Sequence, residues 1–565
     1  MGIPSYFSYI IKNFSNIICN YKNHMILKTT EDVDNKISLY MDCNSIIYDV
    51  YNSLDKDSIL ENDIENVIIE NVIQKIKYYI DKVNPTRYAF IAFDGVAPFA
   101  KMEQQRTRRY KSKYSIDIED KVLNKPNRPN KWNTSSITPG TLFMNMLSEK
   151  VSAHFYNENT SSIQMIISGS NYAGEGEHKM FQHIRENTFV DDTLYVYGLD
   201  SDLIMLSIFH CSIYCNNIYI FRESQEFSKN KPIECVSLPK ELLFMNISLL
   251  SKSILNIMGF SDNNTFINDK YNRIYDYILL CFFLGNDFLP HFPSLNIRTT
   301  GIQVLLDTYN LYISKFIHER GFILKCGGVI DWKWVFVFIH ELSKIEHNLL
   351  LTEYKTRDKM NNMKLPQTTI EDKQQLITNI PIIYRSEEKY ICPTEPYWED
   401  RYYYALFTNS NYSSINQCNY INEVCHNYLQ GLEWVYYYYT IGCPHWRWKY
   451  KYHYPPLLCD LNEYIKNQIK PHENISFLKN IHGINRPFLP LVQLSYVIPK
   501  DYHSLIDNKM RDIITPYYLN YPVSYNYQWA FCRYFWESHV VLPEISVEQL
   551  ELWETQYIDN TGIIS

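Results

Sequence analysis

The sequence predicts an α/β protein whose central sheet is mostly parallel and flanked by helices. Two observations support this prediction. Short, almost wholly apolar runs recur through residues 1–310, and stretches with helical periodicity separate them. Continuous apolarity is typical of strands that are buried on both faces, as in a parallel sheet that is covered by helices. The alternation of such strands with helices therefore indicates an α/β layout.

The predicted elements follow one another along this part of the chain. The expected strands are residues 37–42 (ISLYMD), 88–94 (YAFIAFD), 163–169 (IQMIISG) and 194–200 (LYVYGLD). Residues 65–83 (ENVIIENVIQKIKYYIDKV) repeat apolar side chains at steps of three and four residues, which predicts a helix between the first two strands.

The chain of 565 residues is too long for one ordinary domain. We expect the α/β domain to cover residues 1–345. Residues 346–395 are polar and aperiodic, which predicts a linker or a surface insertion. Residues 396–565 are rich in aromatic side chains, and we expect them to form a second, mainly helical block.

Acidic residues stand where the predicted strands end. Asp42, Asp94 and Asp200 each close one of the four strands. The complete set of candidate acids is Asp42, Asp94, Glu175, Glu177, Asp200, Asp202 and Asp287. Because the carboxyl ends of parallel strands open onto one edge of the sheet, where α/β folds bind ligands, we expect these side chains in one crevice. A single acid of this kind is usually a solvated loop residue, but the group of seven is not explained in that way.

A crowded set of carboxylates favours bound cations. Like charges in one crevice raise one another's pKa and cost stability unless cations lie among them. Oxygen ligands without His or Cys suit Mg²⁺, with Mn²⁺ as a substitute, rather than zinc. Two such ions, roughly 4 Å apart, can clamp the attacking and leaving oxygens of phosphodiester hydrolysis. The spacing of the acids thus predicts a metal-dependent phosphodiester hydrolase.

A basic segment follows the second predicted strand. If FAKMEQQRTRRY (99–110) is helical, one face carries Lys101, Gln105, Arg108 and Arg109 at positions i, i+4, i+7 and i+8. Such a run is usually a solvated face, but here it directly follows Asp94. Arginine forks bind phosphate bidentately. We interpret the face as a pocket for a terminal phosphate, which implies cutting near a chain end.

Bulk composition excludes several classes of protein. A formal net charge of −8 argues against indiscriminate coating of nucleic acid. Thirteen Cys residues show no zinc-type spacing, so we expect reduced thiols. The apolar runs are shorter than the roughly 20 residues that a membrane span requires, and the N-terminus lacks the basic region of a signal peptide. We expect a soluble, cytoplasmic protein without membrane contacts, and a monomer.

Several motifs together resemble the XRN family of 5′→3′ exoribonucleases. These motifs are MGIPSYF, YMDCNSIIYD, FDGVAPFAKMEQQRTRR, ITPGTLFM, SGSNYAGEGEHKM, YGLDSDLIML, FFLGNDFLPH and GLEWVYYYYTIGCPHWRWKYKYHYPP. They cover both conserved blocks of the family. The resemblance implies a PIN/flap-nuclease-like core and processive 5′→3′ hydrolysis of single-stranded RNA that bears a 5′-monophosphate, with two Mg²⁺ ions and release of nucleoside monophosphates. A decapping enzyme would be a partner that delivers the RNA.

The resemblance also implies roles for individual residues. The seven acids named above would hold the metal ions, and Lys101, Gln105, Arg108 and Arg109 would form a 5′-phosphate pocket too small for a cap or a triphosphate. In the family, a His and a Trp stack on the 5′ base. Here the position of the His is Tyr48, and the Trp is either Trp446 or Trp448. Stacking contributes about 1–3 kcal/mol per base and tolerates any sequence.

Two other functions are compatible with the fold. A flap-type, structure-specific endonuclease shares the acidic sheet edge, but it typically adds a Gly-x-Gly turn after the last acid, and HFPSLNIRTTGIQVLLDTY (291–309) has one Gly. A catalytically silent RNA-binding protein would be expected to lack one of the acids, and all are present. Compactness and A/T-biased residue usage indicate a large DNA virus or a parasite, so that the location would be the host cytoplasm or the virion if the source is viral.

Overall fold

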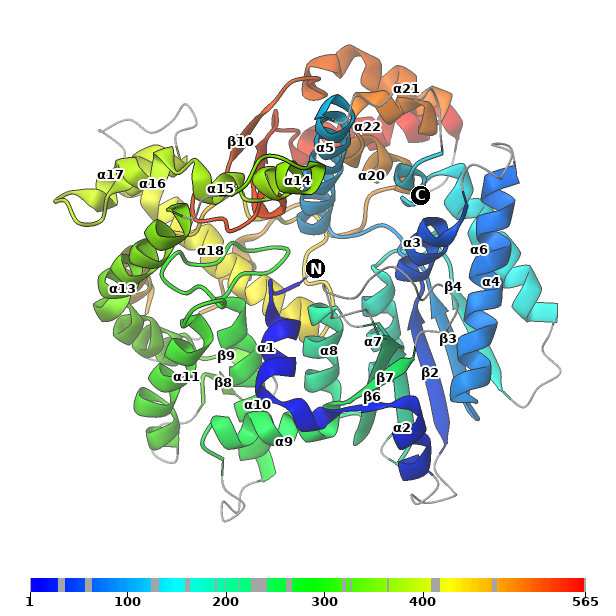
Figure 1. Ribbon diagram of the computed structural model, residues 1–565, viewed down its shortest axis with the longest axis horizontal. Helices are drawn as coiled ribbons and strands as arrows, with labels where there is room; N and C mark the ends of the chain where they lie inside the picture. The colour runs from blue at the N-terminus through cyan, green and yellow to red at the C-terminus, as the bar shows by residue number, and fades with distance from the viewer. Residues whose placement is uncertain are drawn as a thin grey trace. The chain divides into compact units, whose positions relative to one another are not determined.

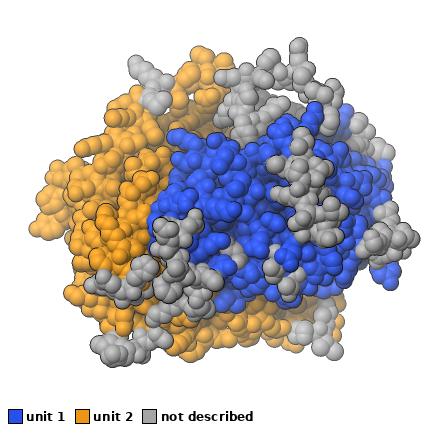
Figure 2. Space-filling model, turned by 90° about the horizontal axis from the view of Figure 1, so that it is seen from below, with its two compact units in different colours: residues 1–96, 136–278, 438–442 blue, residues 97–135, 279–437, 443–565 orange. Residues whose placement is uncertain are grey.

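The structure is a computed structural model. It describes residues 2–28, 36–55, 63–122, 132–157, 163–187, 189, 191–198, 200–211, 213–224, 241–260, 267–317, 322–325, 328–362, 365–407, 417–469 and 475–562. The chain divides into two compact units, which Figure 2 colours separately. Unit 1 comprises residues 1–96, 136–278 and 438–442, and unit 2 comprises residues 97–135, 279–437 and 443–565.

Unit 1 contains a seven-stranded sheet with the order β1-β7-β6-β5-β2-β3-β4 (Figure 1). The strands are β1 (Ile18–Asn20), β2 (Ile37–Asp42), β3 (Tyr88–Ala92), β4 (Gln164–Ser168), β5 (Thr193–Tyr197), β6 (Asn217–Glu223) and β7 (Leu242–Asn246). The pairs β5–β6, β2–β5, β2–β3 and β3–β4 are parallel. Within the described part of this sheet, only the two pairs that involve β7, with β1 and with β6, are antiparallel. The predicted α/β fold with a mostly parallel sheet is therefore confirmed.

The four predicted strands correspond to β2, β3, β4 and β5, because each is a continuous apolar run. Tyr40 of β2, Ile91 of β3 and Val196 of β5 have no exposed surface, as expected for strands that are covered on both faces. The sequence reading missed β1, β6 and β7, which extend the sheet beyond β5. In β6 the apolar run is confined to residues 218–221, because Asn217 precedes it and Arg222 and Glu223 follow it.

Helices surround this sheet. They are α1 (Tyr6–Asn13), α2 (Tyr21–Lys28), α3 (Asn44–Ser53), α4 (Ile64–Val83), α6 (Leu142–Asn157), α7 (Gly176–Glu186), α8 (Ser201–Cys211) and α9 (Ile247–Ile257). The predicted helix 65–83 is α4, which ends at Asn84 in the left-handed conformation (φ 51°) before Pro85. Helix α7 packs on β2 and β3, and α8 packs on β6, which places the starts of α7 and α8 beside the sheet (Figure 1).

Unit 2 is mainly helical, as expected for the second block. Its helices are α5 (Phe99–Val122), α11 (Gly301–Tyr312), α13 (Trp332–Asn361), α14 (Ile370–Thr378), α15 (Ile380–Ile383), α16 (Ser386–Ile391), α17 (Trp398–Phe407), α18 (Gln417–Thr440), α19 (Leu458–Gln468), α20 (Pro490–Val497), α21 (Asn508–Ile514) and α22 (Val547–Thr561). Two small hairpins accompany them, β8 (Leu324–Lys325) with β9 (Val329–Ile330), and β10 (Asn526–Gln528) with β11 (His539–Val541). Helix α10 (Ile267–Phe282) begins in unit 1 and ends in unit 2, and the last turn of α18 belongs to unit 1.

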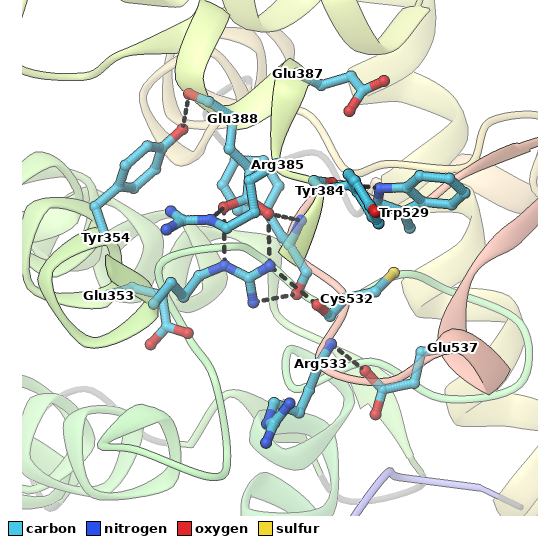
Figure 3. Close-up of polar contacts among 12 residues, drawn as sticks. Glu353, Tyr354, Tyr384, Arg385, Glu387, Glu388, Trp529, Cys532, Arg533 and Glu537 are labelled. Atoms are coloured by element: carbon cyan, nitrogen blue, oxygen red, sulfur yellow. Dashed lines mark hydrogen bonds and ion pairs between the residues drawn. The ribbon is translucent and has the colours of Figure 1, made fainter. Parts of the chain in front are cut away.

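The segment 346–395, expected as a linker or surface insertion, carries the end of α13 and all of α14, α15 and α16. Two of its buried arginines, Arg357 and Arg385, are paired with the buried Glu388 inside the unit (Figure 3). Arg357 of α13 donates from Nε and Nη2 to the carboxylate of Glu388 in α16, at 2.9 and 2.5 Å, and from Nη2 to the carbonyl oxygen of Cys532 at 3.0 Å. Paired buried charges stabilise helices that a search for apolar periodicity does not find. The division of the chain into domains at residues 1–345, 346–395 and 396–565 stays a prediction from the sequence.

Within the described residues, no helix combines the length and the apolar character that crossing a bilayer demands.

Candidate metal centre and basic helix

The order of the strands brings the predicted acids of unit 1 to one edge of the sheet. Strands β5, β2, β3 and β4 are consecutive neighbours and run parallel. Asp42 is the last residue of β2, and Asp94 and Asp200 follow the ends of β3 and β5. Glu175 and Glu177 lie at the start of α7, which follows β4. The carboxyl ends of four adjacent strands thus supply the acids, as the parallel arrangement predicts.

Asp42 and Asp94 are held by the first residues of α3 and α7. Asn44 donates from Nδ2 to Asp94 Oδ2, and its Oδ1 accepts from the backbone N–H of Asp94 at 3.1 Å. The backbone N–H of Gly176 donates to Asp94 Oδ1 at 2.7 Å. A Cβ atom at position 176 would lie 2.7 Å from Asp42 Oδ1, so only glycine permits this approach of α7 to the two carboxylates.

Among the described residues, Glu175, Glu177 and His178 form a group of three neighbouring side chains that could hold a metal ion. One potential ligand atom of each lies within 4.8 Å of those of the others, and all three side chains are buried. The carboxylate of Glu175 accepts a hydrogen bond from the hydroxyl group of Tyr438 at 2.6 Å. Glu177 lies in the first turn of α7, at the positive end of the helix dipole.

Asp202 occupies the corresponding place at the start of α8. Its side chain is buried, and its Oδ1 accepts a hydrogen bond from the hydroxyl group of Tyr439. Gly2 lies against it, since a Cβ atom at position 2 would fall 2.2 Å from Asp202 Oδ1. Asp200, two residues earlier, is exposed.

The acids at this edge of the sheet lie close together, and few positively charged side chains are near them to offset their charge. Burial raises the pKa of Asp42 well above its usual range, and the charges of Asp94, Asp200 and Glu175 raise it further. The nearby Lys179 donates from Nζ to the carbonyl oxygens of Phe93 and Gly169, both at 2.9 Å. Burial lowers the pKa of Lys179 to about 8, although Asp94 and Asp42 act in the opposite direction.

The donor set fits divalent cations. Carboxylate oxygens predominate, which suits hard ions such as Mg²⁺ or Mn²⁺, and His178 adds one nitrogen that Mn²⁺ tolerates well. The raised pKa of Asp42 also indicates a cation site, because a cation between the carboxylates would offset both the loss of hydration and the repulsion by neighbouring acids that raise this pKa. The described part of unit 1 therefore contains a buried acidic cluster with the composition of a divalent-metal site.

The seventh predicted acid, Asp287, belongs to unit 2. It is paired with Lys101 of α5, whose Nζ lies 2.9 Å from Asp287 Oδ2, and both side chains are almost fully buried. Burial alone would raise the pKa of Asp287, but the ammonium group of Lys101 holds the pKa well below its usual range. A common site for this acid and the six acids of unit 1 stays a prediction.

The basic segment is helical, as expected, within the 24-residue helix α5. Its four predicted phosphate-binding residues differ in their surroundings. Lys101 is paired with Asp287, and Gln105 accepts a hydrogen bond from Gln493 Nε2 at 3.3 Å. Arg109 donates to the carbonyl oxygen of Thr134 at 2.8 Å, whereas Arg108 is exposed.

Arg106, which lies between these residues and was not predicted as part of the pocket, anchors α5 within unit 2. It is buried and donates to the carbonyl oxygens of Pro543 and Asn520, at 3.0 and 2.9 Å. Of the two neighbouring arginines on either side of Thr107, the buried one is structural and the exposed one is available to a ligand.

The three candidate stacking residues have different exposure. Tyr48 lies in α3 of unit 1 and is half-buried. Trp448 is 5% exposed and stacks on Trp434, with ring centroids 5.3 Å apart. Trp446 is half-buried; its carbonyl oxygen accepts a hydrogen bond from the backbone N–H of Phe99, and its own N–H donates to Asn485 Oδ1. Trp448 is thus a core residue, and Trp446 is the more exposed of the two.

Sequence reasoning missed several residues that contact the acids or lie near them. Asn44, Lys179 and His178 stand inside the quoted motifs, so their closeness in sequence to Asp42 and Glu177 was a usable signal. Tyr438 and Tyr439 were not recoverable in this way, because they are more than 230 positions from Asp202 and Glu175 and lie in a run that reads as ordinary aromatic core.

Comparison with known proteins places this geometry in a family. Residues 1–224 match the family model described as "XRN 5′-3′ exonuclease N-terminus", and residues 268–392 and 391–561 match "Xrn1 helical domain". The fold and the acidic sheet edge therefore define a nuclease-type protein, and the chain belongs to the XRN family of 5′-3′ exonucleases.

Curated relatives of the chain are named as 5′-3′ exoribonucleases. The chain is 27% identical over 98% of its length to "5′-3′ exoribonuclease 1" of Homo sapiens, of which it covers 34%, and 25% identical over 97% of its length to "5′-3′ exoribonuclease 1" of Saccharomyces cerevisiae, of which it covers 43%. The chain thus spans less than half the length of these relatives. The solved structure "The catalytic core of Rad2 in complex with DNA substrate" aligns over 83% of this chain and 95% of that chain, with a TM-score of 0.32 and 11% identity, a likeness too low to support a further statement.

Proposed function

We propose that the chain is a processive 5′→3′ exoribonuclease that degrades single-stranded RNA with a 5′-monophosphate by hydrolysis at two divalent cations, with Mg²⁺ as the physiological ion. Membership of the family and the names of its relatives support the reaction class. The acidic edge of unit 1 supports hydrolysis rather than RNA binding alone. We also propose a cytoplasmic monomer that receives its substrate from a decapping enzyme.

One observation carries this proposal. At the carboxyl ends of four adjacent parallel strands, the acids crowd closely enough for Asp94, Asp200 and Glu175 to raise the pKa of Asp42. Repulsion of this kind costs folding free energy, and it is typical of sites whose ligand is a cation. A protein that only bound RNA would have no use for such a cluster, because its charge repels phosphate.

In this proposal different residues have different roles, either as ligands of the cations or as residues that hold the ligands in place. Asp42, Asp94, Glu175, Glu177, Asp200, Asp202 and Asp287 would hold the cations. When bound, the cations supply an activated water and neutralise charge on the attacking and leaving oxygens. Asn44 and Gly176 would keep Asp94 in place by the hydrogen bonds that they donate to it. Lys179 would hold the ends of β3 and β4 together through the carbonyl oxygens of Phe93 and Gly169.

The basic helix α5 would select the RNA end. Arg108 is exposed and Arg109 is partly so, which leaves their guanidinium groups within reach of a phosphate. Lys101 would divide its charge between Asp287 and the phosphate, and Gln105 would add a neutral donor. Because charge-assisted hydrogen bonds are roughly twice as strong as neutral ones, the 5′-monophosphate would contribute much of the binding free energy.

For the stacking residues, we propose Tyr48 and Trp446. Trp446 is preferred to Trp448 because the ring of Trp448 is buried against Trp434. Tyr48 offers a ring face but no ring nitrogen, so stacking is the contribution expected from it.

The proposal is tested with one RNA that carries a 5′-monophosphate, a 5′-triphosphate or a 5′-hydroxyl group, labelled at its 3′ end, together with a circular copy. Each RNA is incubated with the protein and Mg²⁺, and the products are sized over time. We expect only the monophosphate RNA to disappear, without a ladder of intermediates, and the circle to survive. Cleavage of the circle would support a flap-type endonuclease, and binding without cleavage would support an RNA-binding protein.

A further inference from the structure

The last turn of α18 places two consecutive tyrosines on two of the acids. Tyr438 donates from its hydroxyl group to Glu175 at the start of α7, and Tyr439 donates to Asp202 at the start of α8. All four residues belong to unit 1. Consecutive residues of a helix point about 100° apart. One helix end can therefore reach the starts of two other helices at the same time.

Both phenol rings are held in a dry environment. Tyr438 is 2% exposed and Tyr439 is 1% exposed. The ring of Tyr438 stacks on the imidazole of His178, with centroids 3.7 Å apart and an angle of 29° between the planes. Tyr439 meets the same imidazole edge-on, with centroids 5.8 Å apart. Rings packed in this way cannot rotate away from the carboxylates, so the direction of each hydroxyl group is fixed.

A phenol is chemically suited to hold a carboxylate that must also bind a cation. It donates one hydrogen bond to one oxygen of the carboxylate, and the other oxygen stays available. Unlike lysine or arginine it carries no charge, so it does not compete with a cation for the site. Hydrogen bonds to a charged acceptor are strong, particularly where water is excluded. In metal sites, partners of this kind orient the ligands, and their loss typically lowers metal affinity about 10–100-fold.

We propose that Tyr438 and Tyr439 are positioning residues that orient the carboxylates of Glu175 and Asp202 for binding of a divalent cation. The inference rests on the proposed function in that it takes the acidic edge to be a metal site. It adds that cation binding at this edge depends on two residues of α18, a helix that otherwise belongs to unit 2. If the tyrosines were only core residues, their rings would matter and their hydroxyl groups would not.

The substitutions Tyr438→Phe and Tyr439→Phe separate these possibilities, since each keeps the ring and removes the hydrogen bond. Tyr437→Phe is the matched control, because it makes the same change in the preceding position of the same helix, where the side chain is half-buried. Binding of Mn²⁺ to the purified proteins is measured by electron paramagnetic resonance, the thermal midpoint is measured without metal, and the rate of RNA hydrolysis is measured over a range of Mg²⁺ concentrations.

We expect Tyr438→Phe and Tyr439→Phe each to weaken Mn²⁺ binding about 10–100-fold and to raise the Mg²⁺ concentration needed for half-maximal hydrolysis by a similar factor. Saturating Mg²⁺ should restore most of the rate, and Tyr437→Phe should behave as the unsubstituted protein. Unchanged Mn²⁺ affinity in both variants would overturn the inference, whatever happens to the thermal midpoint. If the unsubstituted protein binds Mn²⁺ but cleaves no RNA, the proposed function fails, and the ratio of Mn²⁺ affinities still decides this inference.

Discussion

The acid Asp42 at the sheet edge of unit 1 and the acids Glu103 and Asp287 of unit 2, which have cationic partners, behave in opposite ways. In unit 1, burial and the neighbouring acids raise the pKa of Asp42. In unit 2, burial would likewise raise the pKa of Glu103, but Lys449, 2.5 Å away, and Arg106 lower it to about 2. Asp287 is held low by Lys101 in the same way. Loss of hydration acts to raise the pKa of all three, so the supply of cations from the chain itself makes the difference.

This difference separates carboxylates that complete the fold from carboxylates that need a ligand. Glu388 is enclosed by the guanidinium groups of Arg357 and Arg385, and its hydrogen-bonding capacity is used within unit 2 (Figure 3). The acids at the sheet edge receive hydrogen bonds from Asn44, Gly176, Tyr438 and Tyr439, none of which carries a charge. An edge that gathers negative charge and supplies mainly neutral donors is suited to an external cation.

The largest effect is expected from removal of an acid of the sheet edge. Asp42→Ala should lower Mg²⁺-dependent RNA hydrolysis by at least about 10³-fold, or roughly 4 kcal/mol, because stabilisation of charge by a bound metal contributes several kcal/mol. RNA binding should be largely retained. Because the substitution also removes repulsion, the metal-free variant should unfold at the same temperature as the parent or a higher one. Unchanged hydrolysis would mean that Asp42 binds no cation.

Removal of a cation in unit 2 should have the opposite effect on stability. Arg357→Ala leaves Glu388 buried beside one fewer positive charge, which is expected to cost about 3–5 kcal/mol of unfolding free energy. Chemical denaturation measures this loss. Lys344→Ala is the control, since the ion pair of Lys344 with Glu341 is largely exposed on the lysine side and worth at most about 1 kcal/mol. Equal losses of unfolding free energy in the two variants would show that the buried Arg357 stabilises the fold no more than the exposed Lys344 does.

Removal of two arginines of the basic helix α5 should have a smaller effect on RNA hydrolysis than removal of Asp42. The double substitution Arg108→Ala and Arg109→Ala should lower kcat/KM for 5′-monophosphate RNA about 10–100-fold, since a hydrogen bond to a charged group contributes about 1.5–3 kcal/mol. Hydroxyl-ended RNA should be affected less. Lys113→Ala on the same helix, where Lys113 is paired with Asp117, serves as the control. Equal slowing of both RNAs would indicate general contact with the RNA backbone.

The last effect is spread over several pH units and is smallest within any one of them; it concerns a carboxyl group of unit 2 for which the described residues provide no ion pair. Glu346 is 4% exposed, and burial raises its pKa to about 8 although it accepts hydrogen bonds from the backbone N–H groups of Leu458 and Cys459. A carboxyl group whose pKa is higher in the folded state stabilises the fold below its unfolded pKa of 4.5, and this contribution is lost as the pH rises to about 8.

Glu346→Gln should therefore gain stability relative to the parent between these pH values, by up to about 1.4 kcal/mol per pH unit. Unfolding free energies measured at several pH values in this window provide the comparison. A Glu103→Gln variant is the contrasting case, because the lowered pKa of Glu103 means that it stabilises the fold throughout the same window. Parallel pH profiles for the parent and the Glu346→Gln protein would refute the assignment.

Much of the fold and of the acidic edge was predictable because its determinants are local. The apolar runs that became β2, β3, β4 and β5 show their burial in their own composition. Once the strands are parallel, the residues that follow them must share an edge, so Asp42, Asp94 and Asp200 could be grouped without any structure. The helical face of α5 follows in the same way from the spacing of its side chains.

Only the tertiary structure decided which charges are compensated and which are not. Lys101 and Asp287, Arg357 and Glu388, and Tyr438 and Glu175 are pairs separated by 31 to 263 positions. The distinction between Trp446 and Trp448, which are two positions apart, likewise depends on Trp434 and not on their own neighbours. Backbone hydrogen bonding imposes periodicity on a local stretch of sequence, whereas the partner of a side chain depends on how the whole chain packs.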